Sequence, residues 1–291
     1  MRNFRFIVGR NLNLFLQNKL NVLLSWFSVL IVLSLYFVFL RDFLVQMVSN
    51  QGVSAQMCEL VSDRFMVAGL LVVVSTTTCF GTIQLRVKDK ESGIFKDYLT
   101  APVSKMTLTM GSVTSTGLVS SAYTIVTFIF CEFYFYYRHG SELTTSVALQ
   151  VMGTLILACF VNALLLFIIS EFISNTTDFS TFGNLYGTIV GFLAGAYLPY
   201  FFYGDWLKNI LFYLPCTQLT SIMRKLFTED IVSVLGVEKA KILSFQLTFG
   251  IELEHDNSFI TKSSQYGVVL IEALGLLLIV VALSKWRRQE R

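Results

Sequence analysis

The fold of this chain depends on Arg86–Ser104, which reads RVKDKESGIFKDYLTAPVS and is the densest run of charge in a strongly apolar sequence. Uncharged runs at 65–85 and 106–131 flank this segment, and each is long enough to cross a bilayer. A highly charged segment between two such runs lies in water. The positive-inside rule places it in the cytoplasm, because it carries Arg86, Lys88, Lys90, Lys96 and Lys105. We therefore predict a membrane protein with a water-exposed cytoplasmic segment at 86–105.

Part of this segment, residues 89–99, is predicted to form a short helix. Pro102 disfavours the α conformation at Ala101, so the helix should end before it. A short helix on a membrane loop is suited to enter a groove on a soluble partner, and the apolar side chains available for this are Ile94, Phe95, Tyr98 and Leu99. An ordinary charged loop between two membrane helices is the alternative interpretation.

The segment also carries a family resemblance, in Glu91, Gly93, Leu99, Pro102, Val103 and Ser104. This spacing resembles the cytoplasmic coupling segment of ATP-binding cassette (ABC) transporter permeases of the second exporter class. Phe95-Lys96-Asp97 departs from the acidic and aliphatic residues that are frequent there. The resemblance implies that a separate ATPase subunit is contacted by Glu91, Gly93, Ile94, Phe95, Tyr98, Leu99 and Pro102. It further implies two ATPase copies and a second permease copy, either identical or related.

Composition excludes several other classes of protein. The 291 residues are 54% hydrophobic and 14% charged, which is typical of a polytopic membrane protein rather than of soluble domains. The chain contains no Gly-Lys pair for a phosphate-binding loop, so we expect no cofactor in it and expect ATP and Mg to bind to the partner ATPase. Protease motifs and metal-ligand spacings are absent, and no basic face suits nucleic acid. We therefore expect a transport subunit and not an enzyme.

The hydrophobic pattern predicts an all-α polytopic membrane protein with a single permease domain over 1–291. Six transmembrane helices are expected, at 20–40, 65–85, 106–137, within 143–170, at 179–199 and at 265–284. Residues 1–19 are predicted to form an amphipathic interfacial helix with cations such as Arg10 toward lipid headgroups, and with an apolar side made of Phe4, Val8, Leu12, Phe15 and Leu16. Residues 201–264 are predicted to form an outer re-entrant helical hairpin, bent at Leu214-Pro215, followed by a polar loop.

The remaining connections are predicted to be loops. Asp42–Arg64 and 138–146 are assigned to the outer side, and His139 and His255 are interpreted as solvated loop residues. Counting spans assigns the turn at 171–180 to the inner side, although this turn holds no Lys or Arg. Cys58 and Cys216 are able to face the outer side, and their spacing leaves a disulfide between them open.

A glycine stripe is predicted within the fifth span, where four glycines recur at i, i+4 spacing, namely Gly183, Gly187, Gly191 and Gly195. Small residues let helix backbones approach closely in a membrane. The stripe therefore indicates tight packing within the subunit or across a dimer seam, and a ligand-lining role is the alternative.

Two acids lie within apolar spans, Glu132 and Glu272. An intramembrane carboxylate suggests function, because burying it in lipid is costly. Glu272, together with Ser75 and Thr76, is a candidate for the cargo path, with a carboxylate satisfied by a neighbouring helix or by water as the equal alternative. Glu132 is nearer the outer end of its span. We interpret it as a carboxylate that a neighbouring helix or water stabilises, without a role in transport.

These observations predict the transmembrane subunit of an ABC transporter in the plasma membrane of a bacterium, with both termini in the cytoplasm. The expected cargo is amphipathic or hydrophobic, such as a drug, a lipid or a peptide, and the expected assembly is a homodimer or a heterodimer with two ATPase subunits. A glycan or polymer exporter of the same class is one alternative. A membrane immunity or accessory protein that binds without pumping is the other.

Overall fold

The computed structural model describes residues 2–17, 34, 36–49, 55–100, 103–195, 200–234, 246, 249–255 and 258–286. Most of the first predicted span, 20–40, lies outside these residues, as does the predicted coupling residue Pro102. The described helices near the N-terminus are α1 (Arg2–Gln17), the π-helix η1 (Tyr36–Leu40) and α3 (Arg41–Ser49). The helices that follow are α4 (Ala55–Glu91), α5 (Ile94–Thr100), α6 (Lys105–His139), α7 (Thr145–Phe172) and α8 (Thr176–Leu193).

The C-terminal part begins with the short 3-10 helix η2 (Tyr200–Phe202), then α9 (Asp205–Phe212) and α10 (Pro215–Val234). Two short antiparallel strands, β1 (Glu254–His255) and β2 (Ser258–Phe259), precede the last helix, α12 (Lys262–Trp286). The protein is thus an all-α polytopic membrane protein with one minimal hairpin of strands. Among the described residues, α4, α6, α7 and α12 are long and apolar enough to cross a membrane.

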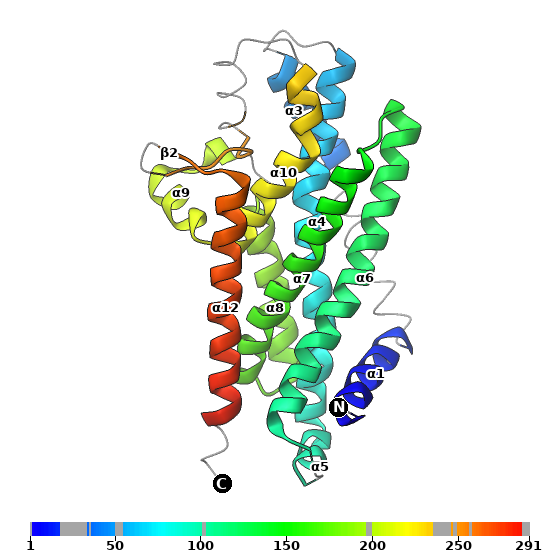
Figure 1. The fold of residues 1–291 in the computed structure, drawn as a ribbon, viewed down its shortest axis with the longest axis vertical. Helices are drawn as coiled ribbons and strands as arrows, with labels where there is room; N and C mark the ends of the chain where they lie inside the picture. Colours follow the sequence, from blue (N-terminus) through cyan, green and yellow to red (C-terminus); the bar gives the residue numbers. More distant parts are fainter. Residues whose placement is uncertain are drawn as a thin grey trace.

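The bundle is built around α4, which packs against α6, α7, α8 and α10. Figure 1 shows these helices running along the long axis of the molecule, with α5 and α1 at one end and α3 at the other. Serine, threonine and glycine are frequent among the buried residues of α6, and such small residues allow close helix contact where lipid supplies no hydrophobic drive. We call the two ends of the bundle the α5 end and the α3 end.

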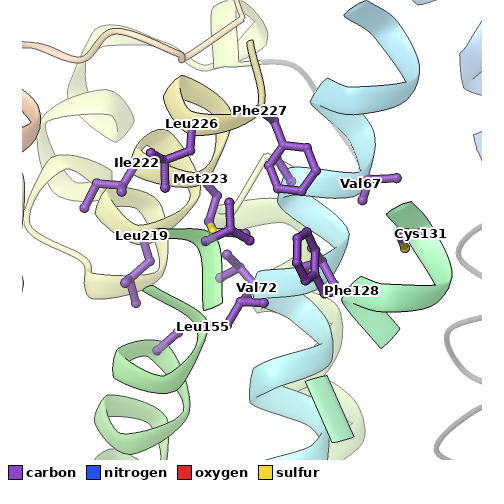
Figure 2. Packing of buried hydrophobic residues seen from close by; sticks show 14 of the residues in the cluster. Val67, Val72, Phe128, Cys131, Leu155, Leu219, Ile222, Met223, Leu226 and Phe227 are labelled. Atoms are coloured by element: carbon purple, nitrogen blue, oxygen red, sulfur yellow. The ribbon is translucent and has the colours of Figure 1, made fainter. Parts of the chain in front are cut away.

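The predicted hairpin is formed by α9 and α10, joined at Tyr213-Leu214. Pro215 is the first residue of α10, a position where its missing N–H and fixed φ are compatible with a helix. Figure 2 shows α10 placing Phe227 and Met223 toward Phe128 of α6 and Val72 of α4, and Leu219 toward Leu155 of α7. The second helix of the hairpin is therefore part of the bundle core at the α3 end.

One predicted loop, Asp42–Arg64, is wrong. This segment contains α3 and the first turns of α4, which begins at Ala55 and not at Phe65. Asp63 is 1% exposed and accepts hydrogen bonds from Tyr36 Oη (2.6 Å) and Arg41 Nε (3.1 Å). His139 Nε2 lies 2.9 Å from its other oxygen, so the prediction of a solvated His139 is also wrong. We call these residues, with Tyr134 Oη at 3.3 Å, the Asp63 cluster.

Arg64, the next residue, is also buried, because its terminal guanidinium nitrogens have hydrogen-bond partners from other parts of the chain. Its guanidinium donates to the carbonyl of Phe227 (3.1 Å) and to Ser141 Oγ (2.9 Å), and it lies over the ring of Phe135. These partners come from α10, from the α6–α7 connection and from α6, so a residue that looks like part of a loop connects three elements. Cys58 and Cys216 are not joined to each other, so the disulfide that the sequence left open is not formed.

Candidate coupling site at the α5 end

The predicted helix at 89–99 is divided into two. α4 continues to Glu91, a turn forms at Ser92-Gly93, and α5 begins at Ile94. Gly93 has φ = 81°, in the left-handed region where residues with a Cβ are strained. The chain therefore reverses direction here because position 93 is glycine, and α5 is a separate helix of 7 residues.

The inner face of α5 rests on two arginines. Arg86 of α4 lies 4.8 Å from the centre of the Phe95 ring, and Arg10 of α1 lies 5.4 Å from the centre of the Tyr98 ring. Both distances are within the range of cation–π attraction. Because a helix this short is marginal alone, these contacts are what position α5. Phe95 and Tyr98 thus face the protein and not solvent.

Arg10 is also paired with Asp89 near the end of α4. Its two terminal nitrogens lie 2.6 Å and 3.0 Å from the two carboxylate oxygens, the bidentate arrangement that the guanidinium geometry favours. The hydrogen bond with Asp89 raises the pKa of Arg10 above its ordinary value, against the opposing effect of burial. The sequence placed Arg10 toward lipid headgroups, and this is wrong because a carboxylate lies within its reach.

Other contacts fix α1 on α6. Asn11 Nδ2 donates to Ser115 Oγ (3.0 Å), and a Cβ at Gly111 would lie 2.8 Å from Ile7 Cγ2. A cavity of about 30 Å³ remains between α1, α4, α5 and α6, room for about one water. Its lining includes Ile7, Arg10, Arg86, Asp89, Phe95 and Tyr98.

Arg86 takes part in a buried group of charges that the sequence did not predict. Its Nε and Nη2 lie 3.1 Å and 2.7 Å from Glu171 Oε1, at the end of α7. Lys90 Nζ lies 3.1 Å from the same oxygen and donates to the carbonyl of Ser170 at 2.8 Å. Arg86 also lies 4.6 Å from the centre of the Phe167 ring. We call Arg86, Lys90, Phe95, Phe167 and Glu171 the Arg86 cluster.

Glu91 contacts the other end of the same connection. Its carboxylate accepts from the backbone N–H of Thr176 (3.1 Å) and from Thr176 Oγ1 (2.7 Å), at the first residue of α8. A carboxylate is favourable there because the first N–H groups of a helix lack partners within the helix. Glu91 therefore joins α4 to α8.

The outer face of α5 is open. Ile94, Asp97 and Thr100, spaced three residues apart on one side of the helix, are exposed. The side chain of Leu99 lies outside the described residues. The residues predicted to contact a partner are thus separated by the structure, with Ile94 facing solvent and Phe95 and Tyr98 facing inward.

The glycine stripe lies mainly against α4. A Cβ at Gly183 would lie 1.9 Å from Cζ of Phe80, whereas at Gly187 the nearest atom would be Thr77 Cγ2 at 3.7 Å. Gly191 is buried, and Gly195, with φ = 65°, lies beyond the end of α8 at Leu193. The helical part of the stripe therefore ends at Gly191.

The residues proposed for a cargo path are in two environments. Ser75 is buried, accepts from Asn162 Nδ2 (3.1 Å) and donates to the carbonyl of Val72, and Thr76 donates to that same carbonyl. Glu272 of α12 is half-buried, and its Oε2 has no hydrogen-bond partner among the described residues. In Glu132, Oε2 accepts from the backbone N–H of Leu143 at 3.0 Å, whereas Oε1 has no hydrogen-bond partner among the described residues. Each of these two acids therefore has one carboxylate oxygen available for a new contact.

Comparison with known proteins agrees with this architecture. The family described as ABC-2 family transporter protein matches residues 46–284, from the end of α3 to the last turns of α12. A search of curated proteins finds no match. The family match covers most of the chain and includes the charged turn between α4 and α6. The chain belongs to the ABC-2 transporter family and is a transmembrane subunit of an ABC transporter.

Proposed function

We propose that this subunit exports an amphipathic or hydrophobic cargo, and that a separate ATPase subunit supplies the energy by docking on α5. The observation that carries the proposal is the division of α5 into two faces. Phe95 and Tyr98 fix the helix on Arg86 and Arg10, while Ile94 and Asp97 are exposed at the tip of the bundle. A rigidly held helix with a free face is suited to receive a push from a soluble partner.

In this proposal the ATPase binds ATP and Mg, and the membrane subunit receives the movement. Two copies of the chain, or this chain and a related one, pair with two ATPase copies. Closure of the ATPases displaces α5, and the contacts behind α5 pass the displacement to the bundle. Family membership supports the association with an ABC ATPase.

The proposed orientation places the α5 end in the cytoplasm. Lys88 and Lys105 are near this end, and Lys285 lies near the end of α12. Basic residues concentrate on the cytoplasmic side of membrane proteins. The α9–α10 hairpin and the strands β1 and β2 then face the outside, together with the Asp63 cluster.

The nature of the cargo is inferred from the spans. Large apolar side chains are exposed along α12, including Ile271, Leu274 and Leu278, and this surface suits lipid or a second copy. A hydrophobic path with few polar groups fits an amphipathic molecule better than a bare ion. Glu272 is the one described carboxylate of α12, and we propose that it faces the cargo.

The experiment begins with recovery of the tagged chain in mild detergent and identification of the proteins that accompany it. The complex is then reconstituted in proteoliposomes with a fluorescent lipid analogue and a fluorescent amphipathic amine as probes. We expect an ABC ATPase to co-purify and ATP to drive movement of one of the probes. A complex that hydrolyses ATP but moves neither probe contradicts the cargo assignment and favours a glycan or polymer exporter. Recovery of the chain without any ATPase contradicts the proposal and favours a non-pumping accessory protein.

A further inference from the structure

The connection between α7 and α8 lacks basic residues of its own, and the structure shows which residues supply them. Residues 171–180 contain two acids, Glu171 and Asp178, and no Lys or Arg. Arg86 and Lys90 of α4 both contact Glu171, and their side chains are 8% and 13% exposed. Two cations from α4 therefore neutralise a carboxylate at the end of α7.

The last turns of α4 contact both ends of this connection. Arg86 and Lys90 contact Glu171 before it, and Glu91 accepts two hydrogen bonds from Thr176 after it. Figure 1 shows the end of α4 and α5 beside the lower ends of α7 and α8. The residues of the connection itself, 173–175, are thus fixed on both sides by the segment that leads into α5.

The backbone that joins α4 to α5 is not held in place by packing at Gly93. This glycine has no side chain, and an added Cβ would meet no atom within 4 Å. Side-chain contacts connect the two helices instead, because the Phe95 ring packs on Arg86 and Arg86 is paired with Glu171. The planar guanidinium contacts both the Phe95 and the Phe167 ring, at 4.8 Å and 4.6 Å from the ring centres, and a lysine ammonium cannot reproduce such stacking.

We infer that α5 and the α7–α8 connection form one rigid unit, and that Arg86 is the positioning residue that passes a displacement of α5 to α7. This inference rests on the proposed docking of an ATPase on α5 only for the source of the displacement. The rigidity itself is a property of the chain alone. The other arginine beneath α5, Arg10, leads to α1 and serves as the matched comparison.

The test measures the distance between spin labels at two exposed positions, Asp97→Cys on α5 and Ser174→Cys in the connection, in a chain without its native cysteines. We expect a single narrow distance distribution in the chain alone, and an unchanged one in the ATPase complex with ATP and vanadate. Arg86→Gln should widen the distribution at least twofold. Arg10→Gln removes the contact with Tyr98 but leaves the Arg86 cluster intact, so it should widen the distribution much less than Arg86→Gln does.

Two further variants separate positioning from simple folding. Arg86→Lys keeps a positive charge near Glu171 but loses the planar stacking, so it should widen the distribution while the recovery of folded protein stays the same. Phe95→Leu keeps the ion pair and removes the ring, and it should widen the distribution equally. A distribution that stays narrow in Arg86→Lys and Phe95→Leu overturns the inference, as does equal widening in Arg10→Gln. Absence of an ATPase from the wild-type preparation counts against the proposed function alone, because the widths are measured on the chain itself.

Discussion

Replacing Gly183 with alanine should destabilise the bundle, whereas the same replacement one turn later should not. The added Cβ at position 183 would lie 1.9 Å from Cζ and 2.1 Å from Cε1 of Phe80. The Phe80 ring has little freedom to move, because it stacks on Phe179 with ring centres 4.5 Å apart and an interplanar angle of 8°. Phe179 is itself buried. At Gly187 the nearest atom would be 3.7 Å away, an ordinary contact.

The size of the effect follows from three contributions. Overpacking a core costs about 1–3 kcal/mol, and losing the Phe80–Phe179 stack costs about 0.5–1.5 kcal/mol. Replacing glycine with alanine in a helix raises the free energy of unfolding by about 1 kcal/mol, because alanine has the higher helix propensity. We therefore expect Gly183→Ala to lower the free energy of unfolding by about 0.5–3.5 kcal/mol, and Gly187→Ala to raise it by less than about 1 kcal/mol.

The assay is the temperature at which a fluorescent fusion of the chain loses its monodisperse gel-filtration peak in mild detergent. A destabilisation of 2 kcal/mol should lower this temperature by about 4–8 °C. Phe80→Ala removes the obstructing ring, so in that background Gly183→Ala should become neutral or stabilising. If Gly183→Ala melts like the wild type, or if Phe80→Ala fails to rescue it, the packing of α8 on α4 is not as described.

Three other predictions concern different parts of the molecule. Asp63→Asn should lower the free energy of unfolding by about 1.5–3 kcal/mol, because it removes the buried carboxylate that accepts from Tyr36 and Arg41, while Arg41 keeps its other partner, Glu59, at 2.6 Å. The same melting assay checks this, with the exposed Asp97→Asn as control, and equal melting of the two variants would contradict it. Gly93→Ala should lower the free energy of unfolding by about 1 kcal/mol, because alanine is strained at the left-handed φ of this position. Gly93→Pro should displace α5 and reduce ATPase recovery in a pull-down, because the proline ring forbids that φ. Full recovery with Gly93→Pro would show that the position of α5 is irrelevant to docking. Glu272→Gln should leave ATPase recovery and basal hydrolysis unchanged and alter only cargo-stimulated hydrolysis, so a loss of basal hydrolysis would contradict a role in the cargo path.

The apolar spans were predictable because membrane helices are recognised by length and composition alone. α4, α6 and α12 contain the apolar runs predicted at 65–85, 106–137 and 265–284, and α7 covers most of the range 143–170 within which the fourth span was predicted. The hairpin was predictable from Pro215, which interrupts an apolar run too short to span. The cytoplasmic segment after α4 was recognisable from its charge, but the turn at Gly93 was not predicted, because the sequence pattern indicates one helix over 89–99.

The buried charges were not predictable, because each depends on partners far away in the sequence. Asp63 and Arg64 looked like loop residues, since nothing nearby neutralises them, yet their partners lie at Tyr36, His139 and Phe227. The orientation of Phe95 and Tyr98 was not predictable for the same reason. Their side chains face inward because arginines from α4 and α1 lie beneath them. The missing basic residues at 171–180 were the one available signal that another segment must approach Glu171.

Site-specific photo-crosslinking from the exposed face of α5 tests the central claim most directly. A photoreactive amino acid at Asp97 should crosslink to the ATPase subunit in membranes, because Asp97 lies on the open side of the proposed docking helix. The same amino acid at Tyr137, which is 85% exposed near the α3 end of α6, should give no ATPase adduct. Adducts from Asp97 alone are the predicted result. Adducts from Tyr137, or none from Asp97 in a complex that contains the ATPase, would contradict the docking of the ATPase on α5.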